Sequence, residues 1–139
     1  MFEHYSLSLA ALLLMLATMM VQTLVAMVAH RKQAHYVPGI VDDALSHDSF
    51  VFRSHRTYQN SLENVPMMAL SLLAAMAAGL NPFILGVIAW IFALARIIHM
   101  ALYYAIATER NPSPRSYFFL IGLLCNLVLL MLMAMTLLS

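Results

Sequence analysis

The chain has 139 residues, of which 63% are hydrophobic and only 9% are charged, whereas soluble domains carry charge on about a quarter of their residues. This composition indicates an integral membrane protein, and the length predicts a single domain over residues 1–139 with no separate soluble module. The formal net charge of +1, without a basic stripe, excludes nucleic acid as a partner, and the single cysteine, Cys125, excludes an intramolecular disulfide.

Four apolar runs follow one another along the chain, each close to the roughly 20 residues that cross the hydrocarbon of a bilayer. Backbone hydrogen bonds must be satisfied inside lipid, so these runs are expected to be helices. The predicted helices cover residues of about 6–29, 58–79, 82–108 and 117–138. Gly79 is expected to end the second helix and Pro82 to open the third. The predicted fold is an all-α membrane protein, a four-transmembrane-helix bundle in the lipid bilayer.

The connections between these runs predict the orientation in the membrane. In the long connection from His30 to about Arg56, Pro38 and Gly39 exclude a continuous helix, and a short interfacial helix is expected over residues 42–52. Apart from Arg96, every Lys and Arg lies in or beside the first and third connections. The positive-inside rule therefore places both connections in the cytoplasm and both termini on the opposite side. The short chain fits a bacterial inner-membrane protein better than a protein of the endoplasmic reticulum.

Polar residues form a stripe at the head of the second predicted helix. Arg56, Asn60 and Glu63 are spaced i, i+4, i+7 and so share one helix face, with Asn64 on the adjoining face. Ionisable groups within a membrane segment are costly, so they usually face a bundle interior and have a function. The stripe therefore marks a candidate site at the cytoplasmic end.

The third predicted helix carries a second stripe, in which Arg96, His99 and Tyr103 are spaced i, i+3, i+7. Arg96 lies at a depth similar to that of Glu63 and is its expected partner. One interpretation is a purely structural buried ion pair. The excess of polar groups favours a binding site instead, because Arg binds carboxylates bidentately and Glu63 can bind an ammonium. These groups suit a small zwitterionic ligand, and the apolar walls suit a second, lipophilic one.

Both stripes resemble the motifs of the MAPEG family, the membrane-associated proteins in eicosanoid and glutathione metabolism. The matching patterns are Arg56-x-x-x-Asn60-x-x-Glu63-Asn64-x-Pro66 and Ala95-Arg96-x-x-His99-x-x-x-Tyr103. The similarity covers nearly the whole chain and includes the microsomal glutathione transferases and microsomal prostaglandin E synthase. It implies a homotrimer with three sites at subunit interfaces near the cytosolic face, and glutathione as the cosubstrate. The sequence departs from better-known relatives at Tyr58, where they carry Gln or His, and at Asn64, where the leukotriene-forming branch carries Tyr.

The resemblance also implies roles for individual residues. The implied glutathione ligands are Arg31, Arg56, Asn60, Glu63, Arg96, His99 and Tyr103. Arg110 stands seven residues after Tyr103, a spacing that resembles that of the arginine credited with stabilising the glutathione thiolate in the leukotriene-forming members. Arg115, at the end of the same Pro-rich stretch, is the rival for this catalytic role. A guanidinium beside the sulfur favours the thiolate, which is the nucleophile.

These features predict an enzyme of detoxification, a glutathione-dependent transferase or peroxidase acting on lipophilic electrophiles. The alternative is a non-catalytic lipid-binding or regulatory protein, as the lipoxygenase-activating member of the family is. A proton-coupled transporter using Glu63 is disfavoured by the arginines around it. No metal is expected, because the histidines of the first connection lack the His-x-x-x-His spacing of a helical ligand set.

Overall fold

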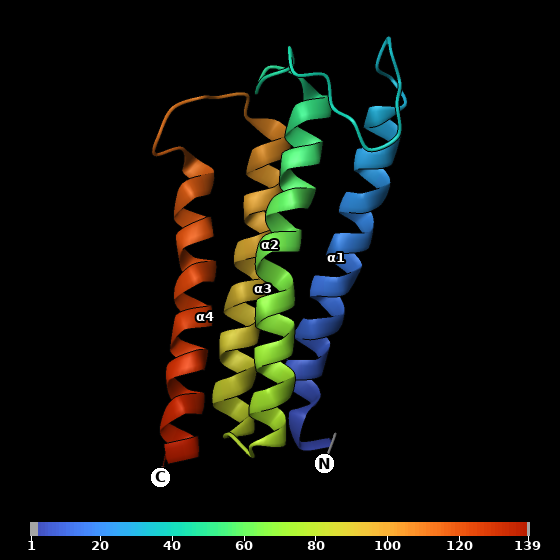
Figure 1. Ribbon diagram of the computed structural model, residues 1–139. Coiled ribbons are helices and arrows are strands. Elements are labelled where there is room, and N and C mark those ends of the chain that lie inside the picture. Colours follow the sequence, from blue (N-terminus) through green and yellow to red (C-terminus); the bar gives the residue numbers. More distant parts are fainter. Residues whose placement is uncertain (1–2, 139) are drawn as a thin grey trace.

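The computed structural model describes residues 3–138, which form a bundle of long helices (Figure 1). A short 3-10 turn, η1 (Glu3–Tyr5), leads into α1 (Ser6–His30), α2 (Phe50–Ala77), α3 (Pro82–Ala105) and α4 (Pro114–Leu138). The helices alternate in direction, so that both termini lie at one end (Figure 1). The other end, which carries connections 31–49 and 106–113, is called the polar end below. The described residues contain no strand, and the prediction of an all-α fold is confirmed.

The prediction of membrane-spanning helices is confirmed for three elements. The segments Glu3–His30, Pro82–Ala105 and Pro114–Leu138 are long and apolar enough to cross a bilayer. Helix α2 is not in this group, because its first half carries the polar stripe. It is also too long for the hydrocarbon: its 28 residues, at about 1.5 Å each, extend over about 42 Å, against about 30 Å for the apolar layer.

The start of α2 differs from the prediction. The helix begins at Phe50 rather than near Tyr58, because backbone hydrogen bonds form equally well where the side chains are polar. Hydropathy marks the apolar part of a helix and misses such an extension. The interfacial helix predicted over residues 42–52 is also wrong: residues 42–49 form turns, in which Asp42 Oδ1 accepts a hydrogen bond from the Ala44 backbone N–H at 2.9 Å.

The ends of the third connection also differ from the prediction. Helix α3 ends at Ala105 rather than near residue 108, because Ile106 is extended, with φ −113° and ψ 112°. Helix α4 begins at Pro114 rather than Tyr117, since proline suits the first helical position. At the opposite end of the bundle the predicted break is confirmed. Gly79 follows α2 with φ 76°, a conformation that favours glycine.

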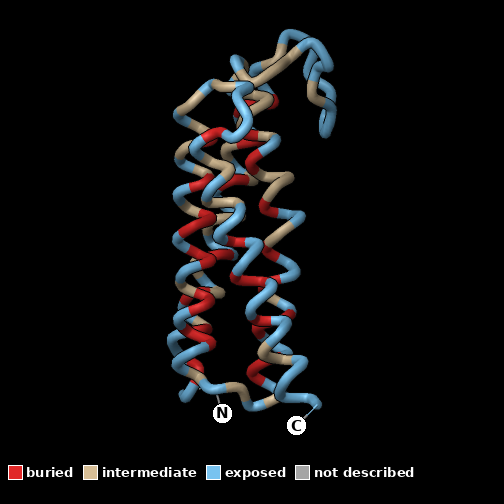
Figure 2. The backbone as a smooth tube through the Cα atoms, turned by 90° about the vertical axis from the view of Figure 1, so that its left-hand side faces the viewer, coloured by how far each residue is buried: buried red, intermediate tan, exposed pale blue. Residues whose placement is uncertain are grey.

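The middle of the bundle is a largely apolar core. Helices α2 and α3 each pack against the three other helices, and α1 and α4 lie outside them (Figure 1). Buried positions follow the inward faces of the helices (Figure 2), and Met68, Leu72, Phe92 and Leu129 are completely buried among them. This packing fixes α2 and α3 against each other, and these two helices carry both polar stripes.

The start of α3 offers a test of the fold. The Asn81 side chain accepts hydrogen bonds from the backbone N–H groups of Phe83 (3.0 Å) and Ile84 (3.1 Å), which have no partner within the helix. Asn81→Ala should lower stability by about 1 kcal/mol, whereas Asn81→Asp, which keeps the acceptor, should change it little. Thermal unfolding in detergent, followed by circular dichroism, measures both variants. An equal loss of stability in Asn81→Ala and Asn81→Asp would contradict the capping role of Asn81.

Candidate functional site

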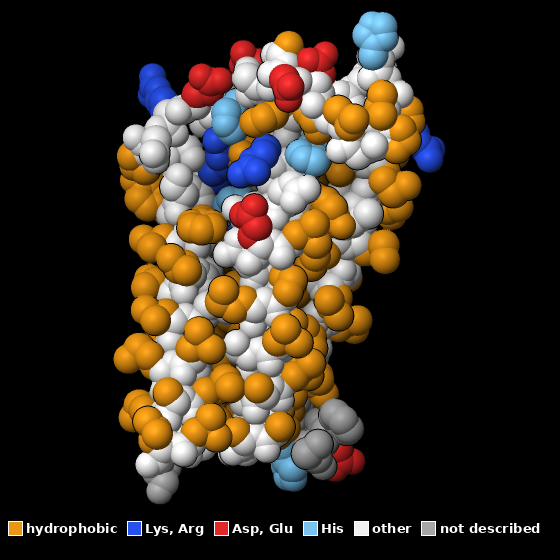
Figure 3. Space-filling model, in the orientation of Figure 1, with side chains coloured by type: hydrophobic (Ala, Val, Ile, Leu, Met, Phe, Trp, Pro, Cys, Tyr) orange, Lys and Arg blue, Asp and Glu red, His pale blue; other side chains and the backbone are white. Residues whose placement is uncertain are grey.

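Charged side chains gather at the polar end of the bundle. On the face shown in Figure 3, all visible Lys and Arg side chains lie there, together with most acidic and histidine side chains, while the rest of the face is largely apolar. The elements that meet at this end are the last turns of α1 and α3, the first turns of α2 and α4, and the two connections. Both predicted polar stripes belong to this region.

Arg96 is the most deeply buried charge of the site, with 3% of its surface exposed. Its Nη2 donates a hydrogen bond to the Ser61 hydroxyl on α2 at 3.1 Å. On the α4 side its aliphatic stem lies beside Gly122: a Cβ built there would lie 3.8 Å from Arg96 Cδ, an ordinary van der Waals contact. The Nε atom of Arg96 is buried without a hydrogen-bond partner. The guanidinium is therefore anchored at one nitrogen and retains donor capacity at another.

Glu63, the predicted partner of Arg96, lies elsewhere on α2. Its side chain is exposed, and it forms neither a hydrogen bond nor an ion pair within residues 3–138. It still acts electrostatically on Arg96. The predicted direct ion pair is wrong for the single chain, because Ser61 rather than Glu63 faces the guanidinium. A carboxylate in this position is available to a ligand or to a second chain.

A second group, called the stack below, consists of His47, His99, Tyr103 and Arg115. The Arg115 guanidinium carbon lies 4.0 Å from the Tyr103 ring centre, a cation–π geometry. Its Nη2 donates to the Thr108 carbonyl oxygen at 3.1 Å and lies 3.5 Å from His47 Nδ1. The rings of His47 and His99 lie 5.8 Å and 5.6 Å from the Tyr103 ring. The stack thus joins α3, α4 and the first connection.

Arg53 fixes the first connection to this group. Its Nη1 donates to the carbonyl oxygens of His47 (2.6 Å) and Asp48 (2.9 Å), and its Nη2 donates to that of Tyr104 at 3.4 Å. One side chain from α2 therefore binds the connection and the last turn of α3 together. Neither Arg53 nor His47 is among the site residues predicted from the sequence. Arg53 could have been found from the sequence, because it stands three residues before Arg56 and so lies near the same helix face. His47 could not, because it has no fixed spacing to either motif.

The other predicted site residues lie at the edge of the region. Arg56 is exposed and lines a cavity of about 330 Å³ together with Asp42 and Asp43 of the first connection. Arg31 is exposed just beyond α1. Arg110 is also exposed, and its only hydrogen bond to described residues is made by its backbone N–H, to Thr108 Oγ1 at 3.2 Å. The single chain thus brings Arg115, rather than Arg110, into contact with Tyr103.

Several buried polar atoms near the two stripes have no hydrogen-bond partner within the described part of the chain. They are Asn60 Oδ1, Arg96 Nε, His99 Nδ1 and Arg115 Nη1. Buried polar atoms are nearly always paired, and an exception calls for an explanation such as a ligand. The set comes from α2, α3 and α4 and contains both donors and an acceptor. The single chain thus leaves several hydrogen-bonding groups unpaired at this end of the bundle.

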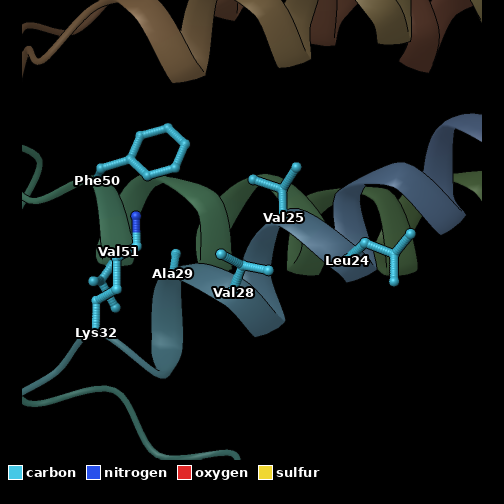
Figure 4. A pocket seen from close by; sticks show the side chains of 7 residues that line it. All are labelled: Leu24, Val25, Val28, Ala29, Lys32, Phe50 and Val51. Atoms are coloured by element: carbon cyan, nitrogen blue, oxygen red, sulfur yellow. The ribbon is translucent and has the colours of Figure 1, made fainter.

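An apolar hollow of about 460 Å³ lies apart from these polar groups, between the end of α1 and the start of α2 (Figure 4). Its lining residues are Leu24, Val25, Val28, Ala29, Lys32, Phe50 and Val51. Lys32 is the one charged residue of this lining. The hollow touches the site region only through Phe50, whose ring lies 5.4 Å from that of Tyr104.

Comparison with known families decides what this architecture is. Residues 7–135 match the model of the MAPEG family, nearly the whole chain. The chain belongs to the MAPEG family. No curated protein and no solved structure matches it. MAPEG membership confirms the resemblance found in the sequence and makes this a membrane protein related to eicosanoid and glutathione metabolism.

The two MAPEG motifs meet through a residue that neither motif specifies. Ser61 occupies an unspecified position between Asn60 and Glu63, yet its hydroxyl is the contact between α2 and Arg96. A serine is small enough to fit between the two helices, and its oxygen can accept the bond from the guanidinium. The geometry of the candidate site thus depends also on a residue between those that the motifs specify.

Removing the Ser61 hydroxyl tests this contact. Ser61→Ala would leave another nitrogen of a buried guanidinium unpaired, so it should lower stability by about 1–3 kcal/mol. Ser54→Ala is the matched control, because Ser54 is equally buried on α2 but donates only to the Val51 carbonyl of its own helix, at 3.0 Å. Thermal unfolding in detergent compares them. Similar losses in both variants would exclude a special role for the Ser61–Arg96 bond.

Proposed function

We propose that this protein is a glutathione-dependent membrane transferase or peroxidase that acts on lipophilic electrophiles. The observation that carries the proposal is the set of buried, unpartnered polar atoms on Asn60, Arg96, His99 and Arg115. Glutathione carries two carboxylates, an ammonium, amides and a thiol, and can use both donors and acceptors of such a set. Family membership supports the same cosubstrate.

The exposed charges extend this binding site. Arg56 offers a guanidinium fork for a carboxylate, and Glu63 offers a carboxylate for the ammonium. Both side chains are exposed in the single chain, next to the exposed apolar side chains of Leu62 and Met67 on α2. An exposed carboxylate on a membrane helix needs a partner. We therefore propose a homotrimer in which a neighbouring chain covers this face, with Arg31, just beyond α1, as a further ligand.

The reaction needs a thiolate, and an arginine can supply the charge that stabilises it. A free thiol with a pKa of about 8.5 is mostly protonated at neutral pH. Arg115 supports this role best, because its Nη1 is buried and unpartnered while Nη2 and the Tyr103 ring hold the guanidinium in place. Arg110, the first candidate from the sequence, has an exposed side chain without such contacts. We propose Arg115 as the residue that stabilises the thiolate and retain Arg110 as its rival.

Two reactions follow from a thiolate at this position. With an electrophilic carbon, a C–S bond forms while the electron pair moves to a leaving group or to a conjugated oxygen, which then takes a proton from water. With a lipid hydroperoxide, an S–O bond forms as the O–O bond breaks, and the alcohol leaves with a proton. The resulting sulfenic acid condenses with a second glutathione to give the disulfide and water. We propose that the site faces the cytoplasm, following the distribution of Lys and Arg, and that the membrane is a bacterial inner membrane, following the short length of the chain.

Glutathione binding, followed by thiolate absorbance at neutral pH, tests the proposal. The purified protein should bind glutathione and raise the thiolate signal. Arg115→Ala should reduce that signal and lower turnover by about 10²-fold, with a smaller change in affinity, because its interaction is strongest with the anion.

The matched variant is Arg110→Ala, which removes an arginine from the connection that leads into α4. It should leave the thiolate signal near the wild-type level. If Arg110→Ala removes the signal and Arg115→Ala does not, the catalytic role belongs to Arg110. A wild-type protein that binds no glutathione in calorimetry would exclude the enzyme proposal as a whole.

The apolar hollow favours a second candidate function, non-catalytic lipid binding. Its volume and nearly uniform apolar lining suit an acyl chain, and Lys32 suits an anionic group at the end of that chain. A protein that binds lipid there without thiol chemistry would be a regulatory or lipid-presenting member of the family. The two candidates differ in whether bound glutathione becomes a thiolate.

Filling the hollow tests the second candidate. Val28→Trp places a large ring in the hollow and should weaken binding of a fluorescent fatty acid at least about tenfold, because the chain loses its apolar cavity. Leu13→Trp is the control, since Leu13 is also on α1 and exposed but does not line the hollow. Equal affinity in the Val28→Trp variant and the wild type would mean that the hollow is not the lipid site.

A further inference from the structure

We propose that His47 is a positioning residue for Arg115: its neutral imidazole holds the guanidinium over Tyr103, and its protonation releases it. The inference rests on the proposed function, in which Arg115 stabilises the thiolate. It assigns a role to the first connection, which lies outside both sequence motifs. It also makes the decrease of activity at acid pH depend on His47, a residue that does not touch the substrate.

The geometry of Arg115 shows why an acceptor is needed at this position. Its Nη2 has two acceptors within reach, the Thr108 carbonyl oxygen at 3.1 Å and His47 Nδ1 at 3.5 Å. The Tyr103 ring supports the flat face of the guanidinium at 4.0 Å but does not fix its rotation in that plane. Acceptors at the edge fix that rotation and so direct the unpartnered Nη1. Neutral His47 supplies one of these acceptors.

The position of His47 is itself held from outside the connection. Arg53 donates to the carbonyl oxygens of His47 and Asp48 at 2.6 and 2.9 Å, so the backbone of residues 47–48 is fixed to α2. The imidazole packs edge-on against Phe52, with ring centres 5.0 Å apart, and lies 5.8 Å from Tyr103. His47 is therefore held by contacts with α2 and α3, although it lies outside the helices.

The charges around His47 favour its neutral form. Partial burial lowers its pKa, and Arg115, Arg56 and Arg53 lower it further, while Glu109 alone raises it. The remaining titratable groups that face it are Tyr103 and, beyond it, His99 on α3. His47 is therefore neutral at neutral pH. As the pH falls through this lowered pKa, Nδ1 loses its acceptor role and the ring becomes a cation beside Arg115.

The consequence for the proposed reaction is a coupling between the first connection and the thiol. While Arg115 is held, its charge stays near the sulfur and the thiol pKa is low. Once His47 is protonated or absent, Arg115 is free to rotate toward water and the thiol pKa rises. As the pH falls, the thiolate fraction of bound glutathione should then decrease more steeply than it would for a thiol with a single fixed pKa.

The experiment measures the thiol pKa of bound glutathione, from the pH dependence of thiolate absorbance, in the full-length protein and two variants. In His47→Ala the pKa should rise and the thiolate fraction at neutral pH should fall about threefold to tenfold, with turnover falling in parallel and glutathione affinity changing less than about twofold. His47→Gln keeps an acceptor that cannot titrate. This variant should retain thiolate at neutral pH. Toward acid pH, its thiolate absorbance should fall less steeply than that of the wild type. His35→Ala, an exposed histidine of the same connection, should match the wild type.

A second measurement is independent of glutathione. The pKa of His47, followed by NMR in the protein without ligand, should rise in Arg115→Ala because a neighbouring cation has been removed. If the wild type forms thiolate and both His47 variants leave its pKa unchanged, the positioning role is excluded. If the wild type forms no thiolate but the His47 pKa responds to Arg115→Ala, the contact stands and the proposed function fails. An unchanged His47 pKa in Arg115→Ala overturns the inference directly.

Discussion

The structure of the polar end depends on burying the Arg96 guanidinium inside a membrane bundle. An isolated charge in a low-dielectric interior is strongly unfavourable, so its surroundings must provide polar contacts and exclude lipid. Ser61 contacts the guanidinium from α2, and Gly122 on α4 lies beside the Arg96 stem and the Phe92 ring. Residues of α2, α3 and α4 therefore meet at this one side chain. Elsewhere in the bundle the buried side chains are mostly apolar.

Much of the fold could be predicted, because helix formation in lipid is dictated by length and apolarity. The breaks at Gly79 and Pro82 followed from local backbone preferences. The start of α2 could not be found in this way, since its first turns lie beyond the apolar run and are helical for reasons of packing and hydrogen bonding. Hydropathy identifies the part of a helix that lies in the bilayer. It does not mark the end of the helix, because the backbone hydrogen bonds continue where the helix leaves the bilayer.

The site was predictable only where helical spacing applies. Arg96, His99 and Tyr103 share a face of α3, and the structure buries all three. The contacts made by Arg115 and His47 are set by the path of two irregular connections, which no periodicity encodes. The Glu63–Arg96 pair failed for a related reason: matching depth along two helices does not fix the rotation of each about its axis. Ser61, two positions from Glu63, faces the guanidinium instead.

The position of the apolar hollow has a consequence for molecular traffic. The hollow is lined by Val25 and Val28 of α1 and Phe50 of α2 (Figure 4). The cavity beside Arg56 is instead bordered by acidic residues of the first connection. A lipophilic molecule would thus enter the apolar hollow from the bilayer, and a water-soluble molecule would enter the cavity beside Arg56 from the aqueous side. Neither would have to cross the medium in which the other is dissolved. Phe50 also packs on Tyr104, next in the chain to Tyr103, so the lining of the hollow is in contact with the last turn of α3.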